Sequence, residues 1–245
     1  MKQSKFIIRE NTAVADHVYR LVLDGDTSEM KRGGQFVDLA IHGFFLRRPI
    51  AAQKWDSESM ILFYKVVGNG TDVLSRMQAG ESLDILTGLG NGFNASACKG
   101  KALVVCGGLG ASPAFTLVKE LLLCGHDVTV VLGFNKYDDM ILADEYRLLG
   151  AEVHIATLDG SAGTKGFVTD VIASLENDFD YFYTCGPKVM MKAVCNSLDI
   201  PGEASLEERM GCGCGICYGC TCHTTKGAKR ICADGPVFKK EEIIW

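Results

Sequence analysis

The sequence contains no apolar run long enough to cross a membrane. A helix that spans a bilayer needs about 18 or more consecutive apolar residues, and no segment of the 245-residue chain comes close to that length. The first residues, MKQSKFIIRENTAV, also lack the apolar centre of a secretory signal peptide. We therefore expect a cytoplasmic protein without a membrane span.

The sequence also lacks a surplus of positive charge. Its formal net charge is -5, and its lysines and arginines are scattered along the chain. A nucleic-acid-binding protein needs a basic face, because much of its affinity comes from releasing the cations condensed on the phosphates. Nucleic acid is therefore not an expected partner.

The sequence also shows no motif that demands nucleophilic catalysis. No arrangement of Ser, His and Asp in the sequence indicates covalent catalysis. The histidines are dispersed, and four of them fit surface or packing positions: His17, His42, His126 and His154. We predict no catalytic side chain, and we look instead for sites that hold cofactors.

What the sequence does contain is the composition of an ordinary globular protein, with 47% hydrophobic and 22% charged residues. Residues 1–97 hold short β-rich runs separated by Gly, Asn and Asp: KFIIRE, HVYRLVLDG, GQFVDLAI, MILFYKVVG and ESLDILTG. Closely spaced short strands are typical of a small antiparallel β-barrel or sandwich. We predict a first domain of this kind over residues 1–97.

The pattern changes in residues 98–202, where apolar strand-like runs alternate with helix-like segments such as SPAFTLVKELLLCG and KVMMKAVCNSL. This alternation predicts an α/β domain with a doubly wound parallel sheet. Residues 203–245 form a third region of cysteines and a short apolar tail. It is too small to fold by core burial alone, and a bound metal would stabilise it.

The stretch VVCGGLGASPAF predicts a nucleotide site. A strand runs into Gly107, Gly108 and Gly110 and then into a helix whose first turn is expected to hold Pro113. Free backbone N–H groups and a helix N-terminus suit a phosphate. Pro113 replaces the third glycine of the dinucleotide-binding pattern, so a plain glycine turn is the alternative. The strand-to-helix context favours the nucleotide.

Two later strand ends belong to the same predicted site. In GFNKYDDM, Asp138 and Asp139 have only Lys136 as a neighbouring cation and would repel a 2′-phosphate, so NAD is favoured over NADP. The run YTCGPKVM places three residues at the carboxyl edge of the sheet, where ligands of such sheets gather: Cys185, Gly186 and Pro187. Taken alone, Cys185 is more simply a buried small hydrophobe.

Two pieces of the first region also suit an anionic cofactor. In FFLRRPIAAQ, Arg47 and Arg48 precede a proline that keeps the chain extended, and could direct a cation at a phosphate or a flavin. In FYKVVGNGTDVLSRM, Gly68 and Gly70 give clearance for a diphosphate, and Thr71 is placed to cap a short helix. A solvated strand end and a simple capped turn are the respective alternatives.

Eleven cysteines in a cytoplasmic chain indicate metal or redox chemistry rather than disulfides. Five of them fall in the run MGCGCGICYGCTCH. Cys212, Cys217 and Cys220 follow the C-x4-C-x2-C spacing of plant-type [2Fe-2S] proteins, and Cys232 lies further on. The interleaved glycines let the loop wrap closely around a cluster and direct amide N–H groups at it.

Two other metals remain open for this run. Cys214 begins a C-x2-C-x2-C pattern typical of [4Fe-4S] proteins, but Thr224 stands where the next cysteine should be. Zinc could use the thiolates or His223, although the spacing fits structural zinc sites poorly. We favour [2Fe-2S], which leaves Cys214 and Cys222 as spare thiols.

Together these motifs resemble the FAD-binding, iron-sulfur electron-transfer subunits of type B, NAD-dependent dihydroorotate dehydrogenases, in the ferredoxin reductase superfamily. The resemblance covers essentially the whole chain. The matching runs are LRRPIA, YKVVGNGT, GLGNGF, CGGLGASP, TCGP and SLEERMGCGCGICYGCTC.

The resemblance implies site residues. Those implied to contact FAD are Arg48, Pro49, Ile50, Ala51, Phe63, Tyr64, Lys65, Gly70 and Thr71. Those implied to hold the cluster are Cys212, Cys217, Cys220 and Cys232. The chain departs from the family at Ala51, where a serine often stands, and at Cys214, which replaces an apolar residue.

The resemblance also implies a function. Electrons would leave dihydroorotate at the FMN of a separate catalytic subunit and reach NAD+ through the [2Fe-2S] cluster and FAD of this chain, in pyrimidine (UMP) biosynthesis. The expected assembly is a heterotetramer with two copies of each subunit. The alternatives are a flavin and iron-sulfur subunit of a hydrogenase, sulfite reductase or ferredoxin:NAD(P) oxidoreductase, and, in another class, a zinc-stapled nucleotide-binding sensor.

Overall fold

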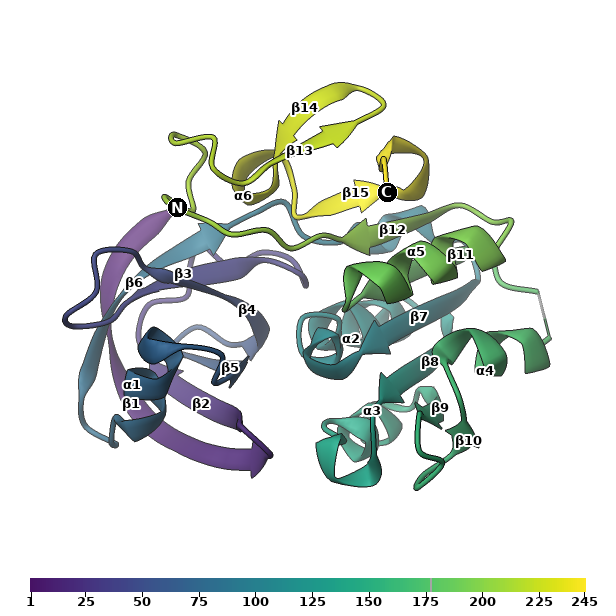
Figure 1. The fold of residues 1–245 in the computed structure, drawn as a ribbon, viewed down its shortest axis with the longest axis horizontal. Helices are drawn as coiled ribbons and strands as arrows, with labels where there is room; N and C mark the ends of the chain where they lie inside the picture. Colours follow the sequence, from purple (N-terminus) through teal and green to yellow (C-terminus); the bar gives the residue numbers. More distant parts are fainter. Residues whose placement is uncertain (177) are drawn as a thin grey trace.

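The computed structural model describes residues 1–176 and 178–245, which form a β-barrel, an α/β domain and a small C-terminal region (Figure 1). The barrel lies beside the α/β domain, and the C-terminal hairpin lies above the junction of the two (Figure 1). No helix within these residues is long and apolar enough to cross a bilayer.

The barrel is closed and antiparallel, with strand order β1-β2-β5-β4-β3-β6. Its core contains Val37 and Leu39, whose side chains point inward from the same strand, and Leu74 of the short helix α1 (Asn69–Arg76). The predicted barrel is confirmed. Its strands are β1 (Lys2–Ala15), β2 (Val18–Asp24), β3 (Phe36–Ala40), β4 (Arg48–Trp55), β5 (Ser59–Lys65) and β6 (Ser82–Leu89).

The α/β domain contains a seven-stranded sheet in the order β10-β9-β8-β7-β11-β12-β15. All its strand pairs are parallel except β12 with β15. The strands are β7 (Lys101–Gly107), β8 (Asp127–Phe134), β9 (Glu152–Thr157), β10 (Thr164–Lys165), β11 (Tyr181–Cys185), β12 (Gly202–Ser205) and β15 (Val237–Lys239).

Helices cover both faces of this sheet. Val104 and Cys106 of β7 pack with α2 (Phe115–Leu123) and α3 (Ala143–Leu149). Leu103 and Val105 of the same strand point the other way, into a core that includes α4 (Val168–Ser174) and α5 (Lys188–Ser197). A strand buried on both faces reads as an unbroken apolar run, which is why KALVVCGG predicted it. The doubly wound sheet is confirmed.

The C-terminal region is joined to the sheet. After β12 the chain forms a loop, residues 211–220, here called the cysteine loop. A hairpin of β13 (Thr221–Thr224) and β14 (Gly227–Arg230) follows, then α6 (Ile231–Asp234), and the chain returns to the sheet as β15. Strand β12 runs across the predicted division between residues 202 and 203, and that division stays a prediction. The described residues also contain the 3₁₀ turns Ala95–Ala97, Gly108–Ala111, Tyr137–Asp139 and Lys240–Glu242.

Two local expectations are wrong in detail. Pro113 is not in the first turn of a helix, because a 3₁₀ turn follows β7 and α2 begins only at Phe115. Thr71 does not stand ahead of its helix, since α1 begins at Asn69. From inside the first turn, its Oγ1 accepts hydrogen bonds from the N–H groups of Val67 and Gly68 at 3.0 and 3.3 Å.

Candidate cofactor sites

The two glycine motifs of the α/β domain interlock at the carboxyl edge of the sheet. A Cβ atom placed on Gly110 would lie 2.2 Å from the carbonyl oxygen of Cys185, and one on Gly186 would lie 2.8 Å from the backbone nitrogen of Gly107. Only glycine allows the two strand ends to approach this closely. The residues predicted from separate stretches of sequence therefore form one structural unit.

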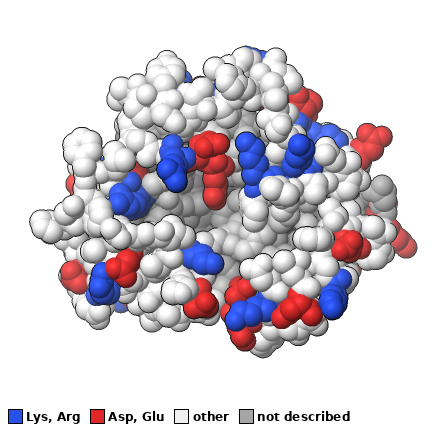
Figure 2. All heavy atoms as spheres, in the orientation of Figure 1, with Lys and Arg blue, Asp and Glu red and all other residues white. Residues whose placement is uncertain are grey.

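A cavity of about 520 Å³, here called the sheet-edge cavity, opens in front of this unit. Its lining includes Gly107, Gly108 and Pro187 from the predicted nicotinamide motifs, and Lys65 from the barrel. Figure 2 shows the surface hollowed between the barrel and the α/β domain. Asp139 also lines the sheet-edge cavity, whereas Asp138 is exposed and pairs with Lys136 at 3.5 Å.

On the barrel, the two predicted phosphate-binding pieces meet. A Cβ atom on Gly70 would lie 2.3 Å from Nε of Arg48, so glycine is what lets the guanidinium lie against α1. The guanidinium also lies 4.8 Å from the centre of the Phe44 ring and donates to the carbonyl oxygen of Leu46. Arg48 is thereby held beside Thr71 and the start of α1.

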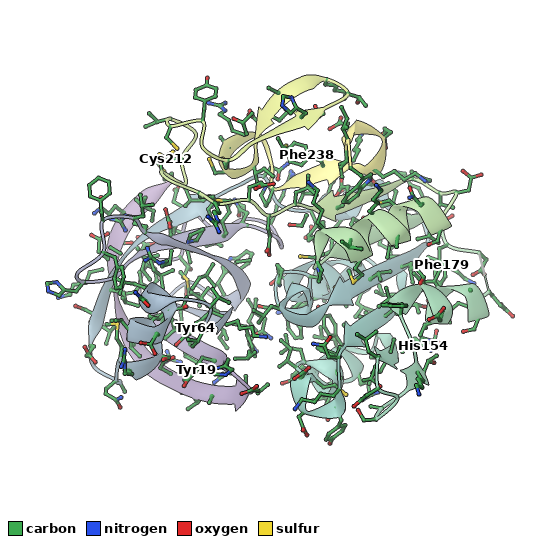
Figure 3. All side chains as sticks on the ribbon, viewed as in Figure 1. Tyr19, Tyr64, His154, Phe179, Cys212 and Phe238 are labelled. Atoms are coloured by element: carbon green, nitrogen blue, oxygen red, sulfur yellow. The ribbon has the colours of Figure 1, made fainter. Side chains whose placement is uncertain are left out.

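A second cavity of about 320 Å³, here called the barrel-side cavity, lies between the barrel and the α/β domain. Tyr64 lines it, and its ring stacks on Tyr19 with centroids 5.5 Å apart (Figure 3). Its hydroxyl donates to Oδ1 of Asn11 at 2.9 Å. The predicted residues that line this cavity are Pro49, Ile50, Ala51, Phe63, Tyr64, Lys65, Thr71, Pro113 and Cys185.

Part of the barrel-side cavity was not predicted from the sequence. Leu206, Glu207 and Met210, which lead into the cysteine loop, also line it. The protein walls around Glu207 raise the pKa of its carboxyl, although the side chain is open to the cleft. Burial raises the pKa of the neighbouring Cys185 thiol to about 12, so Cys185 stays protonated at neutral pH.

The cysteine loop directs backbone N–H groups at sulfur. The Sγ atom of Cys212 accepts from the N–H groups of Ile216 and Cys217, at 3.3 and 3.4 Å. The Sγ atom of Cys217 accepts from Gly219 at 3.4 Å, and that of Cys220 accepts from Cys232 at 3.4 Å. Such donors stabilise thiolates bound to iron.

The four predicted ligands form two pairs, Cys220 with Cys232 and Cys212 with Cys217, and the members of each pair lie close together. The Sγ atoms of Cys220 and Cys232 are 3.2 Å apart, and Cys217 donates its N–H to the sulfur of Cys212. Within residues 1–176 and 178–245, no three His, Cys, Asp or Glu side chains form a group that could hold a metal ion. The thiol donors, the glycines and the N–H groups aimed at sulfur are the donor chemistry that a cluster of two irons requires.

The surroundings of the predicted ligands shift the pKa values of two thiols, Cys212 of the loop and Cys232 of α6, in opposite directions. Burial opposes ionisation of Cys212, but hydrogen bonds from the backbone of Cys217 and Cys214 lower its pKa to about 6. Burial, and then the neighbouring Cys220, raise the pKa of Cys232 to about 12. A metal that binds these sulfurs must displace the proton from Cys232.

Asp38 of β3 is a further residue that the sequence did not single out. Its side chain is 2% exposed and lies under the cysteine loop, which carries the labelled Cys212 in Figure 3. Burial raises the pKa of Asp38 to about 6, opposed by Arg47 and Arg48 and reinforced by Cys212. No sequence pattern reveals this position, because an acidic residue on the outer face of a strand is ordinarily solvated.

The predicted site residues thus lie in three adjoining places. Arg48 and Gly70 adjoin the barrel-side cavity through their neighbours Pro49 and Thr71, which line it. Gly110 and Gly186 pack against the backbone at the ends of β11 and β7, and they do not line the sheet-edge cavity. Of the predicted cluster cysteines, Cys212, Cys217 and Cys220 lie in the loop that follows Met210, and Cys232 lies in α6 beside Cys220. Their contacts with cofactors stay predictions.

Comparison with sequence families matches two parts of the chain. Residues 104–196 match the family described as an oxidoreductase NAD-binding domain. Residues 207–244 match the family described as the iron-sulfur cluster binding domain of dihydroorotate dehydrogenase B. These matches fall on the α/β domain and on the cysteine region.

Comparison with solved structures finds the same fold over nearly the whole chain. A structure of the NADH-dependent reduced ferredoxin-NADP oxidoreductase, studied for flavin-based electron bifurcation, superposes with a TM-score of 0.90 at 30% identity. The match covers 98% of this chain and 90% of that one.

Comparison with curated proteins finds relatives of matching length, each named as the electron transfer subunit of dihydroorotate dehydrogenase B (NAD(+)). The protein from Bacillus pumilus is 40% identical, over 99% of this chain and 98% of its own length. The protein from Fusobacterium nucleatum is 37% identical over 99% of both chains. This chain therefore belongs to the family of electron transfer subunits of NAD(+)-dependent dihydroorotate dehydrogenase B.

Proposed function

We propose that this chain transfers electrons to NAD+ from an FMN-containing catalytic subunit that oxidises dihydroorotate, in the synthesis of pyrimidines. Its cofactors are FAD, an iron-sulfur cluster and NAD. The observation that supports this most directly is the barrel-side cavity, which joins Ala51 of the barrel, Cys185 of the sheet edge and Met210 next to the cysteine loop. The three predicted sites therefore adjoin one another.

The residues present fit FAD on the barrel. Arg48 is aimed beside the first turn of α1, where free N–H groups and a cation suit a diphosphate. Pro49, Ile50 and Tyr64 give the barrel-side cavity an apolar wall suited to a flat ring system. The chain is divided accordingly in our proposal: residues 1–97 for FAD, 98–202 for NAD and 203–245 for the cluster.

When bound, the cofactors supply the chemistry: an iron-sulfur cluster passes single electrons, a flavin handles one or two, and nicotinamide takes a hydride. The protein's own contribution is position and exclusion of water. Phe63 and Leu206 are both 7% exposed and close the barrel-side cavity with apolar surface. Cys185 stays protonated and therefore places no charge there.

The sheet-edge cavity favours NAD over NADP. Asp139 and Asp16 line it from opposite domains, and Lys65 is the only Lys or Arg among the lining residues that the structure describes. Two carboxylates in one cavity would repel a 2′-phosphate. Asp16 was not predicted from the sequence, because it lies in the turn between β1 and β2, far along the chain from the nucleotide motifs.

The catalytic subunit is proposed to dock over the cysteine loop. Ile216 is 79% exposed and Tyr218 is 64% exposed, and both lie between ligand cysteines. Large apolar side chains exposed at a redox centre suit a protein interface. We propose a heterotetramer of two chains of each kind, acting in the cytoplasm, where thiols such as these remain reduced.

Anaerobic co-expression with the catalytic subunit tests this function. We expect FAD, two irons and two acid-labile sulfides per chain, and dihydroorotate-dependent reduction of NAD+. A colourless, flavin-free chain that contains zinc would contradict the proposal. The solved structure at 30% identity favours one competing function, transfer between reduced ferredoxin and NAD(P). Reduction of NAD+ by ferredoxin but not by dihydroorotate would support that alternative.

A further inference from the structure

Asp38 is a buried carboxyl group, one oxygen of which has no hydrogen-bond partner among the residues that the structure describes. Its neighbours Val37 and Leu39 point into the barrel, so Asp38 points outward, where a carboxylate would normally meet water. Here the cysteine loop covers it. The side chain is 2% exposed, and Oδ1 has no hydrogen-bond partner among the described residues. A buried charge without a partner destabilises a fold and is retained mainly where function requires it.

The loop approaches this carboxyl through a glycine. Gly213 has φ 64°, and a Cβ atom at this position would lie 2.5 Å from Oδ2 of Asp38. Gly213 directly follows the cluster ligand Cys212. Any larger residue at position 213 would push the cysteine loop away from Asp38. Glycine at this position therefore allows the carboxyl to lie against the loop.

Arg47 and Arg48 act on Asp38 without forming an ion pair with its carboxyl. The guanidinium of Arg47 donates to the side chain and the backbone oxygen of Asp84, and reaches only the backbone oxygen of Asp38, at 3.3 Å. The guanidinium of Arg48 lies against Gly70 and donates to Leu46. Arg47 and Arg48 therefore offset the charge on Asp38 only in part, because neither guanidinium donates to its carboxyl oxygens.

Asp38 also lies between the two redox sites. It is paired in register with Pro49 of β4, which lines the barrel-side cavity. Phe36, two residues earlier on the same face of β3, lines that cavity too. Because a strand rises about 3.3 Å per residue, Asp38 lies roughly 7 Å along β3 from Phe36.

We propose that Asp38 lowers the midpoint potential of the iron-sulfur cluster and so favours transfer of each electron from the cluster to the flavin. This inference rests on the proposed function. One electron leaves the cluster and one enters the flavin, with no bond formed or broken. A reduced cluster has one more negative charge than an oxidised one, and a nearby buried carboxylate repels it. Asp38 is a positioning residue that acts through the cluster.

The test is an EPR-monitored redox titration of the assembled complex at pH 8, comparing wild type with Asp38→Asn. At the potential where the wild-type cluster is half reduced, we expect the ratio of reduced to oxidised cluster to rise on the order of tenfold in the variant. The matched control is Asp84→Asn. Asp84 also binds Arg47 but is exposed, so the ratio should stay unchanged.

An unshifted potential in a fully loaded Asp38→Asn complex overturns the inference, as does an equal shift in Asp84→Asn. If Asp38→Asn does not load iron, Asp38→Ser is measured in its place. Loss of iron in both variants assigns Asp38 a structural role and also overturns the inference. Failure of the proposed function looks different, because the wild-type complex itself would then lack an iron-sulfur signal.

Discussion

The sheet edge and the cysteine loop are built by opposite means. At the sheet edge, backbone atoms are in contact: the Cβ position of Gly110 lies 2.2 Å from the carbonyl oxygen of Cys185. In the cysteine loop, residues 211–220 form no helix or strand, and the contacts run from N–H groups to sulfur. The first site is shaped before its ligand arrives, whereas the second needs its metal to complete it.

The strongest test of this contrast is Cys220→Ser. Cys220 is 2% exposed and adjoins Cys232. Its substitution removes a buried sulfur ligand, and water cannot reach this position to take its place. We expect iron to be lost and dihydroorotate-dependent NAD+ reduction to fall at least about 100-fold. NADH should still reduce the bound flavin, because the sheet edge does not depend on the loop. Iron, sulfide and flavin analysis with stopped-flow absorption measures both.

The control for this variant is Cys124→Ser. Cys124 is exposed and lies outside the loop, at the end of α2. It should keep its iron and its activity. If Cys220→Ser also lost its reaction with NADH, the two regions would be coupled, and the contrast drawn above would be wrong.

The second test acts on the sheet edge through Gly110→Ala. The added methyl group would overlap the backbone of Cys185, which cannot move without shifting β11. We expect the free energy of unfolding to fall by about 2–3 kcal/mol, and NADH to react more slowly with the flavin, while iron content stays normal. Chemical denaturation and rapid kinetics check the two effects.

Gly68→Ala is the matched control. Gly68 has an extended backbone (φ 179°) and no atom within 4 Å of its Cβ position, so its unfolding free energy should change by less than about 0.5 kcal/mol. If both alanines cost the same, close approach to Cys185 would not be the reason that glycine is needed at position 110.

The third test concerns Arg48. This site shares features with both regions, because a side chain carries the charge and a glycine backbone allows it to come close. In Arg48→Lys a flexible ammonium replaces the planar guanidinium that rests on Gly70. We expect FAD to bind about tenfold more weakly, or about 1.4 kcal/mol, by fluorescence titration of the flavin. Arg47→Lys should leave FAD affinity unchanged, because Arg47 binds Asp84 instead. Equal losses in both variants would show that Arg48 has no special role.

The features that could be predicted from the sequence are those that leave a local pattern of residues. Alternating apolar runs predicted the barrel and the doubly wound sheet, and the spacing of Cys212, Cys217 and Cys220 located the cluster loop. Strand β4 was recognised only as a flavin motif, because the proline in RRPIAAQ hides its strand pattern. Local patterns identify elements, but their exact starts depend on the turns between them, as at Pro113.

Contacts between distant segments could not be predicted in the same way. Asp16, Asp38 and Glu207 lie at the sites only because the barrel, sheet and loop come together in the folded chain. Each is a common acidic residue in an ordinary local setting. The pairing of β12 with β15 was also missed, since it joins short segments whose paired residues are 32 to 36 positions apart, across the cysteine loop.

The smallest expected effect concerns Glu203 of β12, the strand that joins the two regions. Glu203 is 5% exposed and accepts a hydrogen bond from the N–H of Asn94 at 3.0 Å. Burial raises its pKa above the ordinary value of 4.5, so the folded chain binds its proton more tightly than the unfolded chain does. Stability should therefore fall as the pH rises from 4.5 through the folded pKa.

The variant Glu203→Gln keeps the acceptor for Asn94 and removes the titration. Its free energy of unfolding should decline less between pH 4.5 and pH 8 than that of wild type, as measured by denaturation at several pH values. A remaining slope is expected, because burial raises the pKa of Asp38, and the protein walls around Glu207 raise the pKa of that carboxyl. The exposed Glu145→Gln is the control and should follow wild type. If the unfolding free energy of Glu203→Gln changed with pH as that of wild type does, Glu203 would add nothing to the pH dependence of stability.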